Sequence, residues 1–196
     1  MLKDNFGGIF MDGSKQSVDS FNKALDNVKI VNVKAINAFL TTENIENTII
    51  ESGLPPNIDI LSIDVDGNDY WLWDRIHYLS PRIVIIEYNA SLGNVVSWAT
   101  PYDPAFDRFK KHPSGFYCSA SLEALHRLGE QKGYKLVGCE SGGVNAFFVR
   151  SDCLPENLLS VSTQEAYRPH KSRLARGFSS ETQFDLIKDL PYVSIP

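Results

Sequence analysis

The sequence of 196 residues lacks several features that would place it in a special class of protein. It contains no run of about 18 apolar residues, so we expect no transmembrane helix and no membrane partner. Its three cysteines are scattered and none forms a C-x-x-C pair, which argues against a zinc site or a disulfide framework. The first ten residues have no signal-peptide pattern, and together with the cysteine usage this predicts a cytoplasmic protein.

Positive charge is also scarce. The chain has 24 acidic residues against 19 lysines and arginines, which gives a net charge of −5 at pH 7, and we therefore expect no nucleic-acid partner. Hydrophobic residues form 43% of the sequence, which at this length is sufficient for the core of a globular domain.

Short apolar runs alternate with amphipathic stretches over the first half of the chain. This alternation predicts an α/β domain with a mostly parallel sheet, because helical crossovers join parallel strands. Two later runs around a Ser-Gly-Gly turn predict an antiparallel hairpin. We expect strands at 7–11, 28–33, 58–64, 82–88, 134–139 and 146–150, and helices at 14–25, 42–51, 69–79 and 119–132.

Capping residues mark several of these boundaries. The hydroxyls of Ser14 and Thr42 are suited to accept hydrogen bonds from the first helical N–H groups, so these residues are the expected N-caps. Gly133 is the expected stop of the helix before it. Residues 36–40 either extend the second strand or form a separate one.

Carboxylates follow the apolar run at 58–63 at the point where the strand ends. Asp64 and Asp66 come directly after it, and Gly67 precedes the next helix. Ligands of open α/β sheets bind just beyond the carboxyl ends of the strands, so the two acids predict a site. Capping of the next helix is the alternative, because helix N-termini favour anions. Glu87, near the end of the next strand, is interpreted as a buried residue with a structural partner.

The motif DVDG at 64–67 is compatible with several kinds of chemistry. An EF-hand calcium loop is excluded, because Asp69 stands where that loop needs glycine and Arg75 where it needs glutamate. A phosphatase with an aspartate nucleophile and Mg²⁺ also has D-x-D-G after an apolar strand. A glycosyltransferase uses D-x-D to hold a metal bound to a nucleotide sugar. The motif alone leaves these two open.

Two further stretches have an unusual composition. Residues 90–119 show no clear periodicity and are rich in aromatic residues, so they form either a wall of a substrate site or a crossover anchored by aromatic packing. Residues 168–176, RPHKSRLAR, are a basic cluster, for which a solvated tail or a salt-bridged edge is favoured over contact with phosphate or nucleic acid.

The segments SIDVDGNDYWLW and PRIVIIEYNA, at 62–73 and 81–90, resemble the FkbM-type family of S-adenosylmethionine-dependent methyltransferases. The likeness covers roughly residues 7–152. It implies the class I methyltransferase fold, a Rossmann-like sheet in which a helix is followed by a late hairpin. Further matching segments are AF at 38–39, TENI at 42–45, SASLEAL at 119–125, GY at 133–134, LVG at 136–138 and NAFFVR at 145–150.

The resemblance implies a binding site for S-adenosylmethionine. Asp12 would accept hydrogen bonds from both ribose hydroxyls, as a carboxylate can from a vicinal diol, with capping of the following helix as the alternative. Ala38 and Phe39 would border the adenine. Asp64 would lie beside the methionine end of the cofactor.

The resemblance also implies a catalytic set for O-methylation of a sugar or another small polar acceptor. Asp66 and Asn89 would face the acceptor. Asp64 or Asp66 would remove the hydroxyl proton, directly or through a metal-bound hydroxyl, so both are also candidate ligands for Mg²⁺.

The first strand of such enzymes and its glycine-rich turn, G-x-G-x-x-G, are not recognisable ahead of Asp12. We therefore expect an N-terminally short methyltransferase-like domain at 1–155 and a C-terminal extension at 156–196. A sheet edge left open would pair with a second copy or a partner chain. The alternative function is a non-catalytic remnant or interaction domain, and the third is the metal-dependent phosphatase or D-x-D glycosyltransferase named above.

Overall fold

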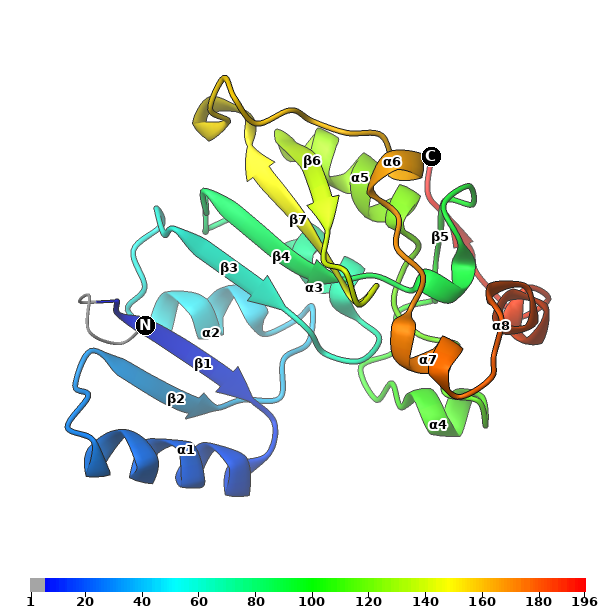
Figure 1. Cartoon of the computed structure of the whole chain (residues 1–196). Helices are drawn as coiled ribbons and strands as arrows, with labels where there is room; N and C mark the ends of the chain where they lie inside the picture. Colours follow the sequence, from blue (N-terminus) through cyan, green and yellow to red (C-terminus); the bar gives the residue numbers. More distant parts are fainter. Residues whose placement is uncertain (1–5) are drawn as a thin grey trace. The chain divides into compact units, whose positions relative to one another are not determined.

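The computed structural model describes residues 6–196, which divide after Pro55 into two compact units (Figure 1). The N-terminal unit, residues 6–55, contains two strands and two helices, and the C-terminal unit, residues 56–196, contains the remaining elements. The expected α/β class is confirmed. Among the helices of residues 6–196, none has the length and apolar character needed to cross a membrane.

The N-terminal unit is built on a parallel pair of strands. β1 (Gly8–Asp12) and β2 (Val33–Asn37) pair along their length, with α1 (Lys15–Asn27) between them in the chain and α2 (Ile45–Glu51) after them. The predicted first helix is confirmed, and the hydroxyl of Ser14 caps it by accepting a hydrogen bond from a backbone N–H of the first turn. Its apolar positions fall on one face, where the side chains of Val18 and Leu25 are buried.

Two predictions in this unit are wrong. The strand expected at 28–33 begins only at Val33 as β2, because the N–H groups of residues 28–30 bond to carbonyls at the end of α1, Lys29 has φ 58°, and Val31 is 94% exposed. Thr42 is not the N-cap of α2, which begins later. Asn44 occupies that position, and its side-chain oxygen accepts a hydrogen bond from a backbone N–H three residues earlier.

A four-stranded sheet forms the centre of the C-terminal unit, in the order β3-β4-β7-β6 (Figure 1). β3 (Ile60–Ile63) and β4 (Ile83–Glu87) are parallel, whereas β7 (Asn145–Arg150) is antiparallel to both β4 and β6 (Tyr134–Cys139). The sheet is therefore mixed: the expected parallel pair is present in β3 and β4, and the expected hairpin adds both antiparallel pairs. The hairpin forms one edge of the sheet, with β7 directly beside β4 and β6 outermost.

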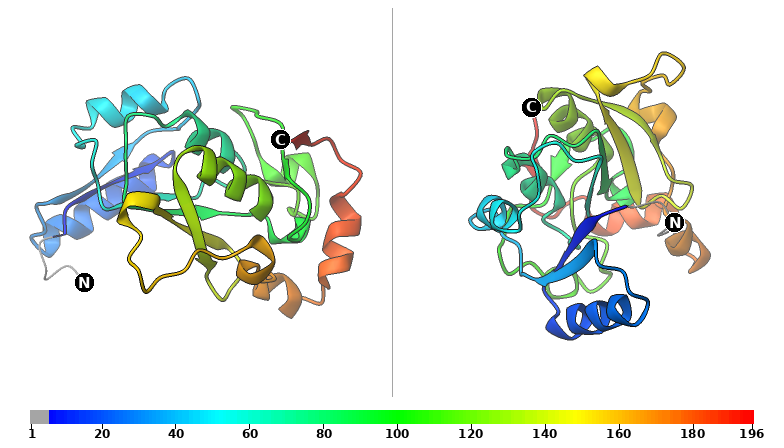
Figure 2. Two further views of the ribbon diagram at one scale, coloured as in Figure 1. Left: turned by 90° about the horizontal axis from the view of Figure 1, so that it is seen from above. Right: turned by 90° about the vertical axis from the view of Figure 1, so that its left-hand side faces the viewer.

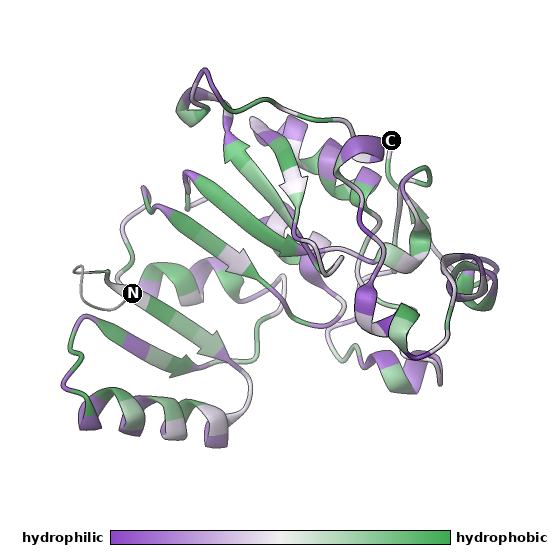
Figure 3. Cartoon of the chain, viewed as in Figure 1, coloured by the Kyte–Doolittle hydropathy of each residue, from purple (hydrophilic) through white to green (hydrophobic). Residues whose placement is uncertain are grey.

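Two helices cover one face of this sheet (Figure 2). α3 (Asp69–Arg75) and α5 (Leu122–Gln131) approach closely at Gly129, where a Cβ atom would lie 2.9 Å from the Phe148 ring and 3.2 Å from Trp73. The Trp73 and Phe148 rings are themselves in contact, with centroids 5.0 Å apart. Strands β3, β4 and β7 are correspondingly hydrophobic (Figure 3). This core fixes the positions of the strand ends.

The aromatic-rich stretch after β4 is ordered by packing rather than by long regular elements. It contains η1 (Ala90–Leu92), β5 (Trp98–Ala99) and α4 (Arg108–Lys111), and β5 pairs antiparallel with β8 (Val193–Ser194) near the end of the chain. A second hydrophobic cluster, which includes Leu92, Phe116, Tyr117 and Ile187, joins this stretch to the C-terminal residues. The other elements are η2 (Ser151–Cys153), α6 (Thr163–Ala166), α7 (Lys171–Ala175) and α8 (Ser180–Ile187).

Candidate functional site

Three carboxyl groups meet at the carboxyl end of β3 and β4. The parallel register places Ile63 opposite Ile86, so the residues that follow them, Asp64 and Glu87, lie at the same end of adjacent strands. Asp69 begins α3 in the loop after β3. One carboxylate oxygen from each of Asp64, Asp69 and Glu87 lies within 4.8 Å of the other two. We call these three residues the acid cluster.

Asp69 is fully buried and held by three hydrogen bonds. Its Oδ1 accepts from the backbone N–H of Val65 at 2.9 Å, and its Oδ2 accepts from the N–H of Gly67 at 3.1 Å and from the hydroxyl of Ser119 at 2.7 Å. Burial nevertheless raises its pKa to about 6, because the hydrogen bonds only partly replace lost hydration. Asp69 thus fixes the loop and also contributes a carboxylate to the cluster.

Glu87 has the most unusual environment in the cluster. Its side chain is only 6% exposed, and its Oε2 atom has no hydrogen-bond partner among residues 6–196. Burial, followed by the charges of Asp69 and Asp64, raises the pKa of Glu87 to about 8. A carboxyl group in this state holds a proton for most of the time at pH 7.

Asp64 is the member of the cluster that faces solvent. Its surroundings still desolvate it enough to raise its pKa above the ordinary value, and the charge of Asp66 acts in the same direction. Glu87 and Arg108 act in the opposite direction. The cluster therefore has two buried carboxyl groups and one that an incoming ligand can reach.

Asp66 is directed to a different partner. Its backbone is left-handed, with φ 57°, and its Oδ1 accepts a hydrogen bond from Arg108 Nη1 at 2.5 Å. Gly67 next to it allows the Phe106 ring to lie against the backbone, since a Cβ atom there would be 2.2 Å from that ring. The sequence predicted Asp64 and Asp66 as the metal ligands. The carboxylates that lie close to Asp64 are instead those of Asp69 and Glu87.

The stretch after β4 contacts this loop through several hydrogen bonds. The hydroxyl of Thr100 donates to the carbonyl of Gly67, and the Trp71 indole N–H donates to the carbonyl of Thr100. The amide of Asn68 donates to the carbonyl of Asp103. These contacts tie two segments more than 25 residues apart, and they fit both interpretations of residues 90–119, a wall of a site and a crossover anchored by packing.

Asn89 lies in an internal hydrogen-bond network. Its Nδ2 donates to the carbonyls of Phe116 and Cys118, and its Oδ1 accepts from the N–H of Ser91 and from Arg173 Nη1. All of these partners belong to the chain itself and the side chain is buried. In this geometry Asn89 positions the segment after β4 and does not present a polar atom to an acceptor.

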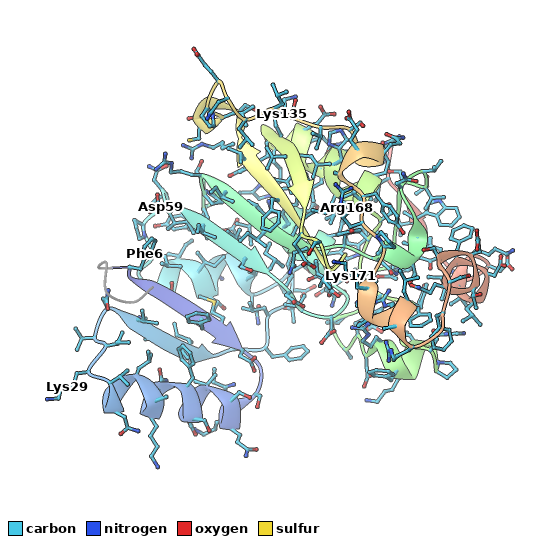
Figure 4. All side chains as sticks on the ribbon, viewed as in Figure 1. Phe6, Lys29, Asp59, Lys135, Arg168 and Lys171 are labelled. Carbon is cyan, nitrogen blue, oxygen red and sulfur yellow. The ribbon has the colours of Figure 1, made fainter. Side chains whose placement is uncertain are left out.

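The basic cluster at 168–176 is only partly a solvated surface. Arg173 is 2% exposed, so the favoured interpretation is wrong for this residue. The carbonyl of Arg168 accepts from the Tyr88 hydroxyl at 2.6 Å, and the N–H of Lys171 donates to the carbonyl of Gly142 (Figure 4). Burial of Arg173 lowers its pKa, and its guanidinium lies over the ring of Phe116.

The cofactor residues expected in the N-terminal unit also lie together. Asp12 ends β1, and its carbonyl accepts a hydrogen bond from the N–H of Ala38. Its Oδ1 accepts from the N–H of Ser14 at 2.6 Å, which leaves Oδ2 open to solvent at the exposed end of the strand. Phe39 is 64% exposed, and a Cβ atom on Gly13 would lie 3.0 Å from its ring.

Sequence reasoning missed the functional potential of Asp69 and Glu87. Both had a usable signal: Glu87 ends an apolar strand in the same manner as the acids after residue 63, and Asp69 follows two other acids in the same loop. No protein-family model matches the chain, and no curated protein matches it significantly.

Proposed function

We propose that this protein transfers a methyl group from S-adenosylmethionine to a hydroxyl group of a small polar acceptor such as a sugar. The observation that carries the proposal is the acid cluster at the carboxyl end of two parallel strands, which is where α/β sheets bind their ligands. The chain pattern supports it as well, since helix α5 is followed by the antiparallel hairpin β6–β7 that the class I methyltransferase fold requires.

In this proposal the exposed end of β1 and β2 binds the nucleoside part of the cofactor. Oδ2 of Asp12 can accept a hydrogen bond from a ribose hydroxyl while Oδ1 keeps its bond to Ser14. The exposed ring of Phe39 provides an apolar face for an adenine, and Gly13 leaves the space beside that ring free of a side chain. These three residues would bind the nucleoside part of the cofactor.

The cofactor supplies an electrophilic methyl group on a sulfonium, which leaves the protein with two tasks: alignment and removal of a proton. Asp64 accepts the proton of the acceptor hydroxyl as the O–CH₃ bond forms and the S–CH₃ bond breaks, and S-adenosylhomocysteine leaves. Partial burial, with the nearby charge of Asp66, raises the pKa of Asp64 and so makes it a stronger base than an ordinary aspartate. Arg108 donates a hydrogen bond to Asp66 and partly offsets the negative charge around Asp64.

A metal-dependent phosphatase or glycosyltransferase is the second candidate. Its supporting observation is the same cluster, because three carboxylate oxygens are the ligands that Mg²⁺ prefers. Hydrolysis of a phosphate monoester, or release of a nucleoside diphosphate from a nucleotide sugar, in the presence of Mg²⁺ would favour this candidate over methyl transfer.

Thermal unfolding with S-adenosylhomocysteine tests the first candidate. At about 100 times its dissociation constant, a ligand adds about 2.7 kcal/mol to the free energy of unfolding, which raises the melting temperature. AMP is the matched control, because it shares the adenine and ribose but lacks the amino-acid part. An equal shift with AMP would indicate a general nucleotide site, and no shift at millimolar S-adenosylhomocysteine would favour the non-catalytic alternative.

A further inference from the structure

We propose that the acid cluster binds one hard divalent cation through Asp64, Asp69 and Glu87. This inference goes beyond methyl transfer, because the cation site is defined by the three side chains alone and is tested without any methyl donor. The proposed ligands differ from the pair expected from the sequence, because Asp69 and Glu87 take the place of Asp66 beside Asp64.

The ligand atoms have the right chemistry and spacing. All three are carboxylate oxygens, which Mg²⁺, Mn²⁺ and Ca²⁺ prefer over nitrogen or sulfur. They lie within 4.8 Å of one another. Two oxygens on opposite sides of one cation are separated by about 4 to 5 Å when each metal–oxygen distance is about 2.0 to 2.5 Å. A single ion can therefore contact all three residues with small side-chain adjustments.

The second observation is the state of Glu87. More than nine-tenths of this residue is buried, its carboxylate belongs to the cluster, and its Oε2 has no hydrogen-bond partner among the described residues. Buried polar atoms almost always have a hydrogen-bond partner, and an oxygen without one in a carboxylate cluster requires an explanation. A bound cation supplies the missing partner at this position.

The hydrogen bonds of Asp69 leave room for such a contact. A carboxylate has about four acceptor positions, and three of those on Asp69 are occupied by Val65, Gly67 and Ser119. Its Oδ1 atom accepts one hydrogen bond there and keeps its second lone pair for a cation. The same hydrogen bonds hold the carboxylate in a fixed orientation, which is what partners of metal ligands do in known sites.

Neighbouring positive groups have other partners. Arg108 donates to Asp66 and to the carbonyl of Gly115, and Arg173 donates to Asn89 and Ser91. Three carboxylates in a partly buried space need compensation, either by protons or by a cation. The exposed side chain of Asp64 provides a route by which an ion enters from solvent.

Mn²⁺ binding to the purified chain, followed by electron paramagnetic resonance of the free ion, tests the proposal. We expect one equivalent to bind, Mg²⁺ to compete for it, and Glu87→Gln to weaken the affinity by about 100-fold, because an amide oxygen carries no net charge. Glu130→Gln is the matched control; this glutamate lies on α5, pairs with Lys135 and should leave Mn²⁺ binding unchanged. Asp64→Asn gives a second ligand variant at an exposed position where folding is not at risk.

The outcomes separate clearly. Equal Mn²⁺ affinity in the parent chain, Glu87→Gln and Asp64→Asn would overturn the site, and millimolar binding of several ions would show an adventitious ion only. Cation binding without any shift by S-adenosylhomocysteine would keep the cation site and reject methyl transfer. The reverse pattern would keep methyl transfer and reject the cation site.

Discussion

The ends of β1 and of β3 look alike in sequence and differ strongly in structure. Each strand is a short apolar run followed at once by aspartate. Asp12 at the end of β1 is exposed, and its side chain makes a local hydrogen bond to Ser14, two residues away. The acids after β3 are surrounded by groups from residues 87 to 119, and two of the three carboxyl groups in the cluster are buried.

The difference shows that the chemistry of a strand-end acid is set by distant parts of the chain. Ser119, which bonds Asp69, is 50 residues away in sequence, and Arg108, which bonds Asp66, is 42 residues away. Asp12, in contrast, accepts a hydrogen bond from Ser14 at the start of α1, only two residues away in the sequence. A buried carboxylate must replace lost hydration, and burial raises the pKa values of Asp69 and Glu87 at the β3 end.

Replacement of Asp69 at the β3 end should have the largest effect on stability. We expect Asp69→Ala to lower the free energy of unfolding by about 3 kcal/mol at pH 7, because three donors lose their acceptor and two of these hydrogen bonds are buried. Urea denaturation measures this. Asp74→Ala, at an exposed position on the same helix, should change stability by no more than about 0.5 kcal/mol. Similar losses in both variants would show that the hydrogen bonds of Asp69 are not what stabilises the loop.

Asp64→Asn should separate activity from stability. Loss of the proton acceptor is expected to lower kcat/KM for methyl transfer by about 100-fold, which corresponds to about 2.7 kcal/mol, with stability changed by less than about 0.5 kcal/mol. Asp59→Asn is the control, because Asp59 lies just before β3 at its opposite end and pairs with Arg82 (Figure 4). If both variants keep full activity, Asp64 is not the base.

Glu87→Gln should change how stability depends on pH. An acid whose pKa is higher in the folded chain than in the unfolded chain binds protons more tightly in the folded chain. The free energy of unfolding therefore falls as the pH rises from the unfolded-state pKa to the folded-state pKa. For Glu87 this window runs from 4.5 to about 8. In the presence of EDTA the variant should be more stable than the parent by up to about 5 kcal/mol at pH 9, and the two should converge near pH 4. Thermal melts across this range measure it, and a less stable variant at pH 9 would contradict the raised pKa.

The sequence was sufficient for the elements that local signals define. The start of α1 follows from Ser14, and the end of α5 follows from Gly133, whose φ of 82° suits glycine. The hairpin of β6 and β7 follows from two apolar runs around a glycine turn. In each case the deciding residues lie within a few positions of the boundary, so one stretch of sequence holds all the information.

The acid cluster and the sheet order could not be obtained in this way. Glu87 and Asp64 meet only because β3 and β4 pair in a particular register, and β7 joins β4 only through packing of the hairpin against α5. The burial of Arg173 depends likewise on Asn89 and Ser91, more than 80 residues earlier. Each of these is a long-range contact, on which helix and strand periodicity has no bearing.

Replacement of Asp12 at the end of β1 should have the smallest effect of these variants, and it completes the comparison with the end of β3. Asp12→Asn keeps an oxygen that can accept from the N–H of Ser14, so stability should change by no more than about 0.5 kcal/mol. The loss of charge should weaken S-adenosylhomocysteine binding by about tenfold, or about 1.4 kcal/mol, since a hydrogen bond to a charged acceptor is stronger than one to an amide. Calorimetric titration measures the affinity, and Asp26→Asn, at the exposed end of α1, is the control. Unchanged affinity combined with a large loss of stability would mean that Asp12 only shapes the turn into α1, and that the β1 end binds no ribose.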